Sequence, residues 1–282
     1  MSKIDLVTPA WLFERLGDPS IVILDGSYYL PAAKRDAEAE YRAEHIPGAI
    51  RFDIDVVKDR NSPLPHMLPE ADEFATAVGL MGISDEHQIV VYDGAGIFAS
   101  PRVAWTFRTF GARRVAVLDG GLPAWRAAGY PTEAGEPEPP EAADFLPEFD
   151  DKAVANLADV RAALASGDAQ VLDARSPARF SAEEPEPRAG MRSGHMPGAL
   201  NLHYGALVKD GHLADPDTIE EAMRASGVDP ARPIVTTCGS GVTAAILLLA
   251  IEQTGRSAPA LYDGSWAEWG SRGDTAVETG PG

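Results

Sequence analysis

The only cysteine of this 282-residue chain, Cys238, lies in a glycine-rich loop of a kind that can do nucleophilic chemistry. The loop, residues 238–243, reads Cys-Gly-Ser-Gly-Val-Thr and joins a β-branched run at 234–237 to an apolar run at 245–251. These runs predict a buried strand and an interior helix. Backbone N–H groups at such a turn point together, and with the helix dipole they favour an anion. We therefore expect a nucleophilic Cys238 thiolate; a buried structural cysteine is the alternative.

The C-terminal half of the chain repeats landmarks of the N-terminal half, in the same order and at a nearly constant offset. The matched pairs are His45-Ile-Pro-Gly-Ala49 with His195-Met-Pro-Gly-Ala199, Leu24-Asp25 with Leu172-Asp173, Asp93 with Cys238, Asp119-Gly120 with Asp263-Gly264, and Trp125 with Trp269. A period this long indicates two copies of one domain. Because Asp93 stands where the second copy has Cys238, the fold does not require a thiol there, which favours a functional cysteine.

Strands alternate with helices in the first copy, and this predicts an α/β fold in which each copy is an open, mainly parallel sheet flanked by helices. Expected strands are 21–24, 88–92 and 114–118; expected helices are 36–44, 70–80, 101–110 and a short one around Trp125. We expect a non-catalytic domain at 1–135, a linker rich in Pro, Glu and Gly at 136–150, and a catalytic domain at 151–282. Ligands of such sheets bind beyond the carboxyl ends of the strands, where the Cys238 loop lies.

The chain has 24 basic and 43 acidic side chains, a net charge of −19, which argues against a nucleic-acid partner. No apolar run approaches the roughly 20 residues of a membrane span, so no membrane partner is expected. The first residues lack the basic flank and apolar core of a secretory signal. A single cysteine suits a reducing compartment. Together these features predict a soluble, cytoplasmic protein.

Three other kinds of site can be weighed against the sequence. Residues 94–99 follow a strand and match the glycine pattern of a dinucleotide site, with Asp119 as its acidic residue. The second copy matches nearly as well at 239–244, so the pattern is better explained as an inherited turn. A cysteine phosphatase needs an arginine where this chain has Ala244. A protease-like pair of cysteine and histidine has no local sequence support.

Arginines near the same sheet edge could supply positive charge for an anionic substrate. Arg175 follows a strand end close to Asp173 and is expected to pair with it. Arg179 and Arg188 lie further along, the second within a Glu-Pro-Glu-Pro-Arg stretch. Ion pairing with the neighbouring glutamates is the alternative for both. The first copy shows no arginine counterpart in this insert, which favours a functional role for Arg179 and Arg188.

These motifs resemble the two-domain sulfurtransferases of the rhodanese family, and the resemblance covers essentially the whole chain. It rests on the paired His-x-Pro-Gly-Ala motifs, the single cysteine in the second copy, and the Asp-Gly with a following Trp in both copies. The 238–243 loop is similar to that of the branch which takes sulfur from 3-mercaptopyruvate, since thiosulfate-preferring members have basic residues at the places of Gly239 and Ser240. The stretches 53–55, 62–69, 179–180 and 183–188 match the same branch.

The resemblance implies two tandem rhodanese-like domains and a double displacement through a persulfide on Cys238, with pyruvate released. It implies that Arg179 and Arg188 hold the substrate, and that Asp55, His66 and Ser240 relay a proton. For His66 the alternative is an ordinary exposed histidine in a Pro-rich loop. The backbone amides of the loop would bind the substrate and the persulfide; these belong to Gly239, Gly241, Val242 and Thr243.

The implied donor is a small anionic sulfur compound, and the implied acceptor is a thiol, thioredoxin or cyanide. The resemblance implies no metal and no organic cofactor. Two alternatives stay open. One is a thiosulfate:cyanide sulfurtransferase, and the other is a non-catalytic sulfur-carrier or binding module that accepts a persulfide from a partner without turning over small donors.

Overall fold

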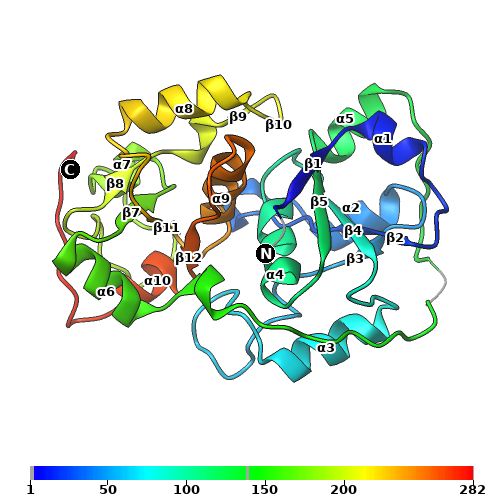
Figure 1. The fold of residues 1–282 in the computed structure, drawn as a ribbon, viewed down its shortest axis with the longest axis horizontal. Coiled ribbons are helices and arrows are strands. Elements are labelled where there is room, and N and C mark those ends of the chain that lie inside the picture. Colours follow the sequence, from blue (N-terminus) through cyan, green and yellow to red (C-terminus); the bar gives the residue numbers. More distant parts are fainter. Residues whose placement is uncertain (1–2, 138–139, 282) are drawn as a thin grey trace. The chain divides into compact units, whose positions relative to one another are not determined.

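A computed structural model describes residues 3–137 and 140–281, which form two compact units (Figure 1). The first unit consists of the described residues of Met1–Arg60, Leu68–Asp150 and Asp210–Leu213. The second consists of those of Asn61–Met67, Asp151–Lys209 and Ala214–Gly282. Each unit thus takes one short segment from the other half of the sequence. Residues 138 and 139 of the predicted linker lie outside the described part.

Each unit is built on a five-stranded sheet whose strands all run parallel, which confirms the predicted α/β class. The first sheet has the order β1-β5-β4-β2-β3 and the second the order β6-β12-β11-β7-β8, so both copies share one topology. The strands are β1 (Asp5–Val7), β2 (Ile21–Asp25), β3 (Ile50–Arg51), β4 (Gln88–Tyr92), β5 (Arg114–Leu118), β6 (Val154–Ala155), β7 (Gln170–Asp173), β8 (Leu200–Asn201), β11 (Ile234–Thr237) and β12 (Ala260–Tyr262). A separate two-stranded hairpin joins β9 (Val208–Lys209) to β10 (His212–Leu213).

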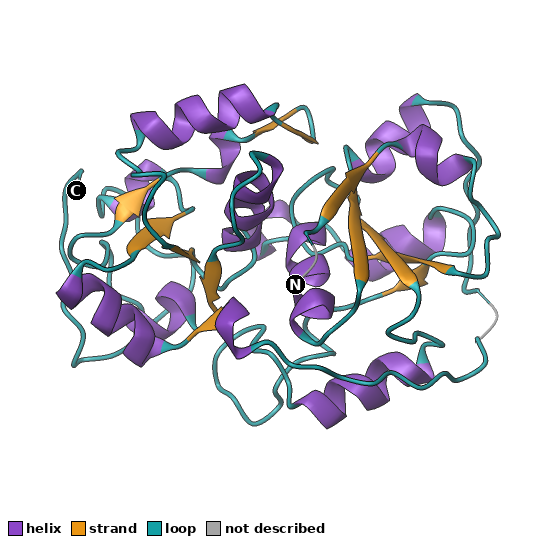
Figure 2. Cartoon of the chain, in the orientation of Figure 1, coloured by secondary structure: helices purple, strands orange, loops and turns teal. Residues whose placement is uncertain are grey.

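Helices flank both sheets, and Figure 2 shows them on either side of the strands in each unit. The helices predicted at 36–44, 70–80 and 101–110 are found within about one residue of those bounds. The first unit contains α1 (Pro9–Phe13), α2 (Ala37–Ala43), α3 (Ala71–Leu80), α4 (Ser100–Thr109) and α5 (Gly121–Ala127). The second contains α6 (Leu157–Ser166), α7 (Pro177–Phe180), α8 (Pro216–Ala225), α9 (Ala244–Gln253) and α10 (Ser265–Trp269). Short 3₁₀ turns occupy Pro31–Ala33, Asp151–Ala153 and Tyr204–Ala206.

Alternate side chains of the first sheet point to opposite faces, as the pleat of a strand requires. Val90 and Tyr92 of β4 share one core cluster with apolar residues of α1 and α5. On the other face, Val91 meets Val103 of α4 beside Gly26, where an added Cβ would lie 2.9 Å from a Val103 methyl group. Glycine at this position therefore lets α4 approach the sheet closely.

The second sheet is covered in the same way. Val235 of β11 packs in a cluster with residues of α6 and α10, while α9 lies against β11 and β12. Residues 244–252 of α9 are all buried, which explains why this helix is apolar almost all round. Within the described residues, no helix is both long and apolar enough to cross a membrane.

The histidine of the duplicated His-x-Pro-Gly-Ala motif binds, in each copy, a segment near the C-terminal end of that copy through backbone hydrogen bonds. The backbone of His45 exchanges hydrogen bonds of 2.9 Å with Glu133, and that of His195 exchanges bonds of 2.9 and 3.0 Å with Glu278. Both imidazoles are buried, stack on an aromatic ring and place Nδ1 beside a backbone carbonyl oxygen. The histidines of this duplicated motif are therefore structural.

Part of the predicted linker packs against the first unit. The N–H of Ala143 donates to the carbonyl of Gly79 at 2.9 Å, and that of Asp150 donates to Thr109 at 2.8 Å. The ring of Phe145 is buried and meets Phe74 of α3 edge-on, with centroids 5.5 Å apart. Residues 143–150 thus follow the surface of the first unit as a packed strap.

Leu248 of α9 is fully buried, so Leu248→Ala should lower the free energy of unfolding. The expected loss is about 2–5 kcal/mol, the range for leucine truncation in a core. Urea unfolding followed by circular dichroism measures it. Leu80→Ala is the matched control, because 70% of Leu80 is exposed and changes at such positions stay within about 0.5 kcal/mol. Equal losses for the two variants would contradict the buried placement of α9.

Candidate active site

Cys238 directly follows β11, the central strand of the second sheet, and is only 2% exposed. The carbonyl groups of Cys238 and Gly239 accept hydrogen bonds of 2.9 Å from the N–H groups of Trp266 and Ala267 in α10. The N–H of Cys238 lies 3.5 Å from Ser265 Oγ. The start of α10 therefore holds the loop through its carbonyl groups.

The N–H groups of this loop are left available. Among the residues that the structure describes, none accepts a hydrogen bond from the N–H groups of residues 239–244. Buried N–H groups are almost always paired with protein, water or a ligand. The loop is therefore suited to hold an anion beside the Cys238 sulfur.

The first unit carries the same loop after β4. There the N–H groups of the loop form a nest, that is, a group of donors directed at one anion, and a carboxylate of the chain occupies it. Asp93 Oδ2 accepts from the N–H groups of Phe98, Ala99 and Ser100 at 2.9–3.0 Å and from Ser100 Oγ at 2.9 Å. Oδ1 accepts from Ala95 N–H at 2.9 Å. A carboxylate that belongs to the chain thus occupies the place where the second unit has its cysteine. This first loop contains no cysteine.

The dinucleotide pattern at 94–99 is explained by the same contacts. Its N–H groups bind the Asp93 carboxylate, and both carboxylate oxygens of Asp119 are engaged elsewhere in the unit. Asp119 Oδ1 accepts from Leu213 N–H at 3.0 Å, and Oδ2 lies 2.9 Å from His212 Nδ1. The loop and the acidic residue therefore both serve the fold.

Arg179 extends from α7 to the Cys238 loop. A Cβ placed on Gly239 would lie 3.0 Å from Arg179 Nη2 and 3.9 Å from Nη1, so the terminal nitrogens of the guanidinium lie against this glycine. The structure thus brings two of the predicted site residues together. Arg175 pairs with Asp173 at 2.6 Å, as its position after the strand predicted.

Glu186 is a residue that sequence reasoning missed. Its side chain is 0% exposed and lies between two arginines, 2.7 Å from Arg175 Nη1 and 2.5 Å from Arg179 Nη2. Arg179 therefore does pair with a neighbouring glutamate, as the alternative expected, but the side chain of that glutamate is buried. The stretch 183–188 contains three glutamates, and the sequence alone offers no signal that singles out this one.

The first unit contains an arginine counterpart, contrary to the sequence analysis. Arg35 Nη2 lies 3.3 Å from the carbonyl oxygen of Gly94, which follows Asp93 as Gly239 follows Cys238. Arg35 also pairs with Glu40 at 2.6 Å, as Arg179 pairs with Glu186. Arg35 lies in the loop before α2, ten residues after Asp25, whereas Arg179 lies six residues after Asp173. A comparison of matched sequence positions therefore does not pair the two arginines.

His66 is buried, with 4% exposure, so the alternative of an ordinary exposed histidine is wrong. Its loop, Asn61–Met67, belongs to the second unit, where His66 Nε2 lies 3.4 Å from Arg188 Nη2. The backbone of His66 has a φ of +59°, in the left-handed region that non-glycine residues rarely adopt. Residues with such backbone strain cluster at active sites and ligand-binding positions.

The other two members of the predicted relay are Ser240 and Asp55. Ser240 is buried in the Cys238 loop. Asp55 belongs to the first unit, where its exposed side chain lies 3.3 Å from Lys58 Nζ. The relay of Asp55, His66 and Ser240 therefore stays a prediction.

Two further side chains lie near the predicted site. His203 and Tyr204 follow β8, at the same sheet edge as the Cys238 loop. Burial lowers the pKa of His203, and the nearby Arg179 charge lowers it further. Burial also raises the pKa of Tyr204, with opposing contributions from Arg179 and Cys238. Their place after a strand end is the signal that could have found them.

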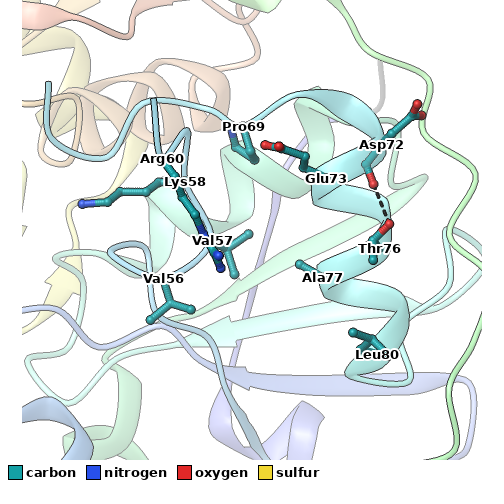
Figure 3. Close-up of a pocket in the computed structure, with 10 residues that line it drawn as sticks. All are labelled: Val56, Val57, Lys58, Arg60, Pro69, Asp72, Glu73, Thr76, Ala77 and Leu80. Carbon is teal, nitrogen blue, oxygen red and sulfur yellow. Dashed lines mark hydrogen bonds between the residues drawn. The ribbon is translucent and has the colours of Figure 1, made fainter. Parts of the chain in front are cut away.

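Metal ligation and a groove of the first unit are two further candidates for a site of function. Within residues 3–137 and 140–281, no group of His, Cys, Asp or Glu side chains is arranged to hold a metal ion. A groove of about 480 Å³ in the first unit lies between α3 and residues 56–60 (Figure 3). None of the predicted site residues lines it. Its walls are formed by Val56, Val57, Lys58, Arg60, Pro69, Asp72, Glu73, Thr76, Ala77 and Leu80.

Because the Asp93 carboxylate fills the N–H nest of the first unit, a change at this residue should alter the stability of the protein. Asp93→Asn should lower the free energy of unfolding by about 3 kcal/mol, because an amide would set two N–H donors among the N–H groups of the loop. Thermal unfolding by calorimetry measures the loss. Asp72→Asn, at an exposed position in the first turn of α3, is the control. If the two variants are equally stable, Asp93 does not hold its loop in the way described.

Comparison with known proteins adds independent findings. The sequence-family model of the rhodanese-like domain matches residues 8–128 and 156–272 of this chain. The chain is 43% identical over 279 residues to the 3-mercaptopyruvate sulfurtransferase of Escherichia coli, covering 99% of both chains. It is 36% identical to thiosulfate/3-mercaptopyruvate sulfurtransferase 1 of Arabidopsis thaliana, covering 97% of this chain and 78% of that one. The crystal structure of SseA from Escherichia coli superposes with a TM-score of 0.86 at 40% identity, covering 94% of this chain and 99% of that one.

Proposed function

The chain belongs to the rhodanese family, and from that premise we propose that it is a 3-mercaptopyruvate sulfurtransferase working through Cys238. The observation that carries the proposal is the Cys238 loop, whose N–H groups face no acceptor among the described residues while the terminal nitrogens of Arg179 lie against Gly239. A thiolate nucleophile, an anion nest and a guanidinium are thereby combined in one place. The name of the Escherichia coli relative supports the choice of donor.

Two arginines would hold the donor. Arg179 uses Nε and Nη2 to bind Glu186, which leaves its Nη1 side free to meet a carboxylate or ketone oxygen. Arg188, close to His66, would hold the other polar group. Guanidinium groups suit this task because their fixed fork matches the planar geometry of a carboxylate.

Sulfur transfer then follows as a nucleophilic displacement at sulfur. The Cys238 thiolate attacks the thiol sulfur of mercaptopyruvate and forms an S–S bond. The C–S bond breaks, and its electron pair passes to the carbon beside the ketone, giving the enolate of pyruvate. The enolate takes up a proton, for which Ser240, His66 and Asp55 form the proposed relay.

The loop amides would hold the persulfide until an acceptor arrives. Gly239, Gly241, Val242 and Thr243 supply N–H groups to the outer sulfur, in the manner of an oxyanion hole. The corresponding loop of the first unit binds the Asp93 carboxylate with such groups, which supports an anion-binding role. A thiol, thioredoxin or cyanide then removes the outer sulfur and regenerates the thiolate.

We assign the remaining roles on the same basis. Residues 1–135 would form the non-catalytic domain, because Asp93 cannot act as a sulfur nucleophile. Residues 151–282 would form the catalytic domain, after a linker at 136–150. The single cysteine supports a cytoplasmic location, since a catalytic thiolate persists in a reducing compartment.

A thiosulfate:cyanide sulfurtransferase is the second candidate. It is supported by the Arabidopsis thaliana relative, whose name gives both donors. The neutral residues Gly239 and Ser240 in the loop weigh against a dianionic donor. A non-catalytic sulfur carrier would need the same cysteine, and its absence of turnover distinguishes it.

Cys238→Ser should abolish sulfur transfer, because a hydroxyl cannot store sulfur as a persulfide. Turnover is measured as pyruvate released from mercaptopyruvate with cyanide as acceptor. Mass spectrometry of the native protein incubated with the donor alone should find one added sulfur atom on the Cys238 peptide. A native protein that gains this sulfur from a persulfide partner, yet never turns over small donors, would establish the carrier alternative.

Arg188→Ala should lower kcat/KM for mercaptopyruvate at least about tenfold, because the variant loses a hydrogen bond to a charged group and such a bond contributes that much to binding. The loss with thiosulfate should be smaller, because thiosulfate has no carboxylate for this arginine to hold. Both donors are assayed with cyanide, and Arg224→Ala at an exposed position of α8 is the control. Equal losses for both donors would remove Arg188 from the substrate site.

A further inference from the structure

We propose that Glu186 is a positioning and specificity residue, which orients Arg179 and offsets its charge so that a monoanionic carboxylate donor is favoured over dianionic thiosulfate. The inference rests on the proposed function, in which Arg179 binds the donor. It assigns a role to a buried carboxylate that the transfer chemistry itself does not use.

The geometry fixes one edge of Arg179 and frees the other. Glu186 Oε2 accepts from Arg179 Nη2 at 2.5 Å, and Oε1 accepts from Nε at 3.3 Å. This pairing uses the side of the guanidinium and sets its plane. The end of the fork, formed by Nη1 and the second N–H of Nη2, remains directed past Glu186, and both terminal nitrogens lie against Gly239.

Glu186 is itself held from behind. Its Oε1 also accepts from Arg175 Nη1 at 2.7 Å. Arg175 is anchored by two hydrogen bonds to Asp173 Oδ2, at 2.6 and 2.9 Å, and it stacks over the Trp266 ring at 4.2 Å. A carboxylate fixed by a buried arginine is a rigid support, so it can orient Arg179 with little loss of conformational entropy on substrate binding.

The same contacts determine the local charge. Asp173 balances Arg175 and Glu186 balances Arg179, and all four charges lie close together where water is largely excluded. Arg188 differs, because within the described residues its recorded hydrogen-bond partner is His66 and not a carboxylate. The four paired charges sum to zero, so Arg188, which the proposed function places on the donor, would supply the one uncompensated positive charge of the site. One positive charge matches a single carboxylate and neutralises only half of a dianion.

A purely structural role for Glu186 is the alternative. The first unit pairs Arg35 with Glu40 in a similar way and has no catalytic cysteine, so the pairing could be inherited scaffold. Loss of scaffold would slow both donors alike, because both react at the same sulfur nucleophile. Loss of charge compensation and orientation would change the ratio of the two donors. The donor ratio therefore separates the two roles.

The test compares kcat/KM for mercaptopyruvate and for thiosulfate, with cyanide as the common acceptor. Glu186→Gln keeps the shape of the side chain and removes its charge, and Glu183→Gln on the exposed part of the same loop is the control. We expect the ratio of mercaptopyruvate to thiosulfate to fall at least about tenfold in Glu186→Gln, and to stay unchanged in the control. Glu186→Asp keeps the negative charge on a shorter side chain, so the mercaptopyruvate-to-thiosulfate ratio should fall less in this variant. If Glu186→Gln does not fold, Glu186→Asp replaces it in the test.

Arg179→Gln separates failure of this inference from failure of the proposed function. If Arg179→Gln leaves kcat/KM unchanged for both donors, the arginine does not bind the donor and the proposed site is wrong. If it shifts the ratio while Glu186→Gln and Glu186→Asp do not, the site stands and the role of Glu186 is refuted. In the Arg179→Gln background, Glu186→Gln should have no further effect on the ratio; an undiminished effect there would show that Glu186 acts through another group.

Discussion

The need of buried N–H groups for an acceptor governs both copies of this fold. The central strand of each parallel sheet ends in a glycine-rich turn that directs a row of N–H groups inward. Carbonyl groups of the turn accept hydrogen bonds from the start of a later helix, α5 in the first unit and α10 in the second. In the first unit the chain satisfies these groups with the carboxylate of Asp93. In the second unit Cys238 stands at that place. One substitution thus decides whether the nest serves stability or is open to an external anion.

The surrounding structure keeps this nest in shape. The duplicated histidines, His45 and His195, join a late segment of each copy to its unit through paired backbone hydrogen bonds. The indole N–H of Trp125 donates to Pro131 at 2.7 Å, and that of Trp269 donates to Ala276 at 2.8 Å, which fastens the same segments a second time. These contacts hold α5 and α10 in place, and α10 in turn anchors the carbonyl groups beside Cys238. Repeated motifs therefore support the site without taking part in its chemistry.

The sequence was sufficient for the elements that it predicted and for the place of Cys238 between a buried strand and an interior helix, because both depend on local patterns. The β-branched run at 88–92 became β4, and the all-apolar run after residue 244 became the buried helix α9. Other features depend on packing over long distances. Whether His66 is buried depends on which unit receives its loop, and the match of Arg35 to Arg179 depends on two different segments reaching one kind of loop. Neither fact is encoded in the spacing of residues along the chain.

The charge of the site also cannot be obtained by counting arginines. The chain carries a net charge of −19, yet Arg179 lies against Gly239 of the Cys238 loop, and Arg175 lies behind it on Glu186. In the proposed site Arg188 joins these two arginines. Arg175 and Arg179 are balanced by buried carboxylates, so their guanidinium groups act mainly through geometry. A site that recognises a small carboxylic acid needs planar, oriented donors more than it needs a strong positive field, since a strong field would also attract sulfate-like dianions. Pairing arginines with buried glutamate and aspartate would meet that requirement, so the proposed site would let an acidic protein select a small anion by shape.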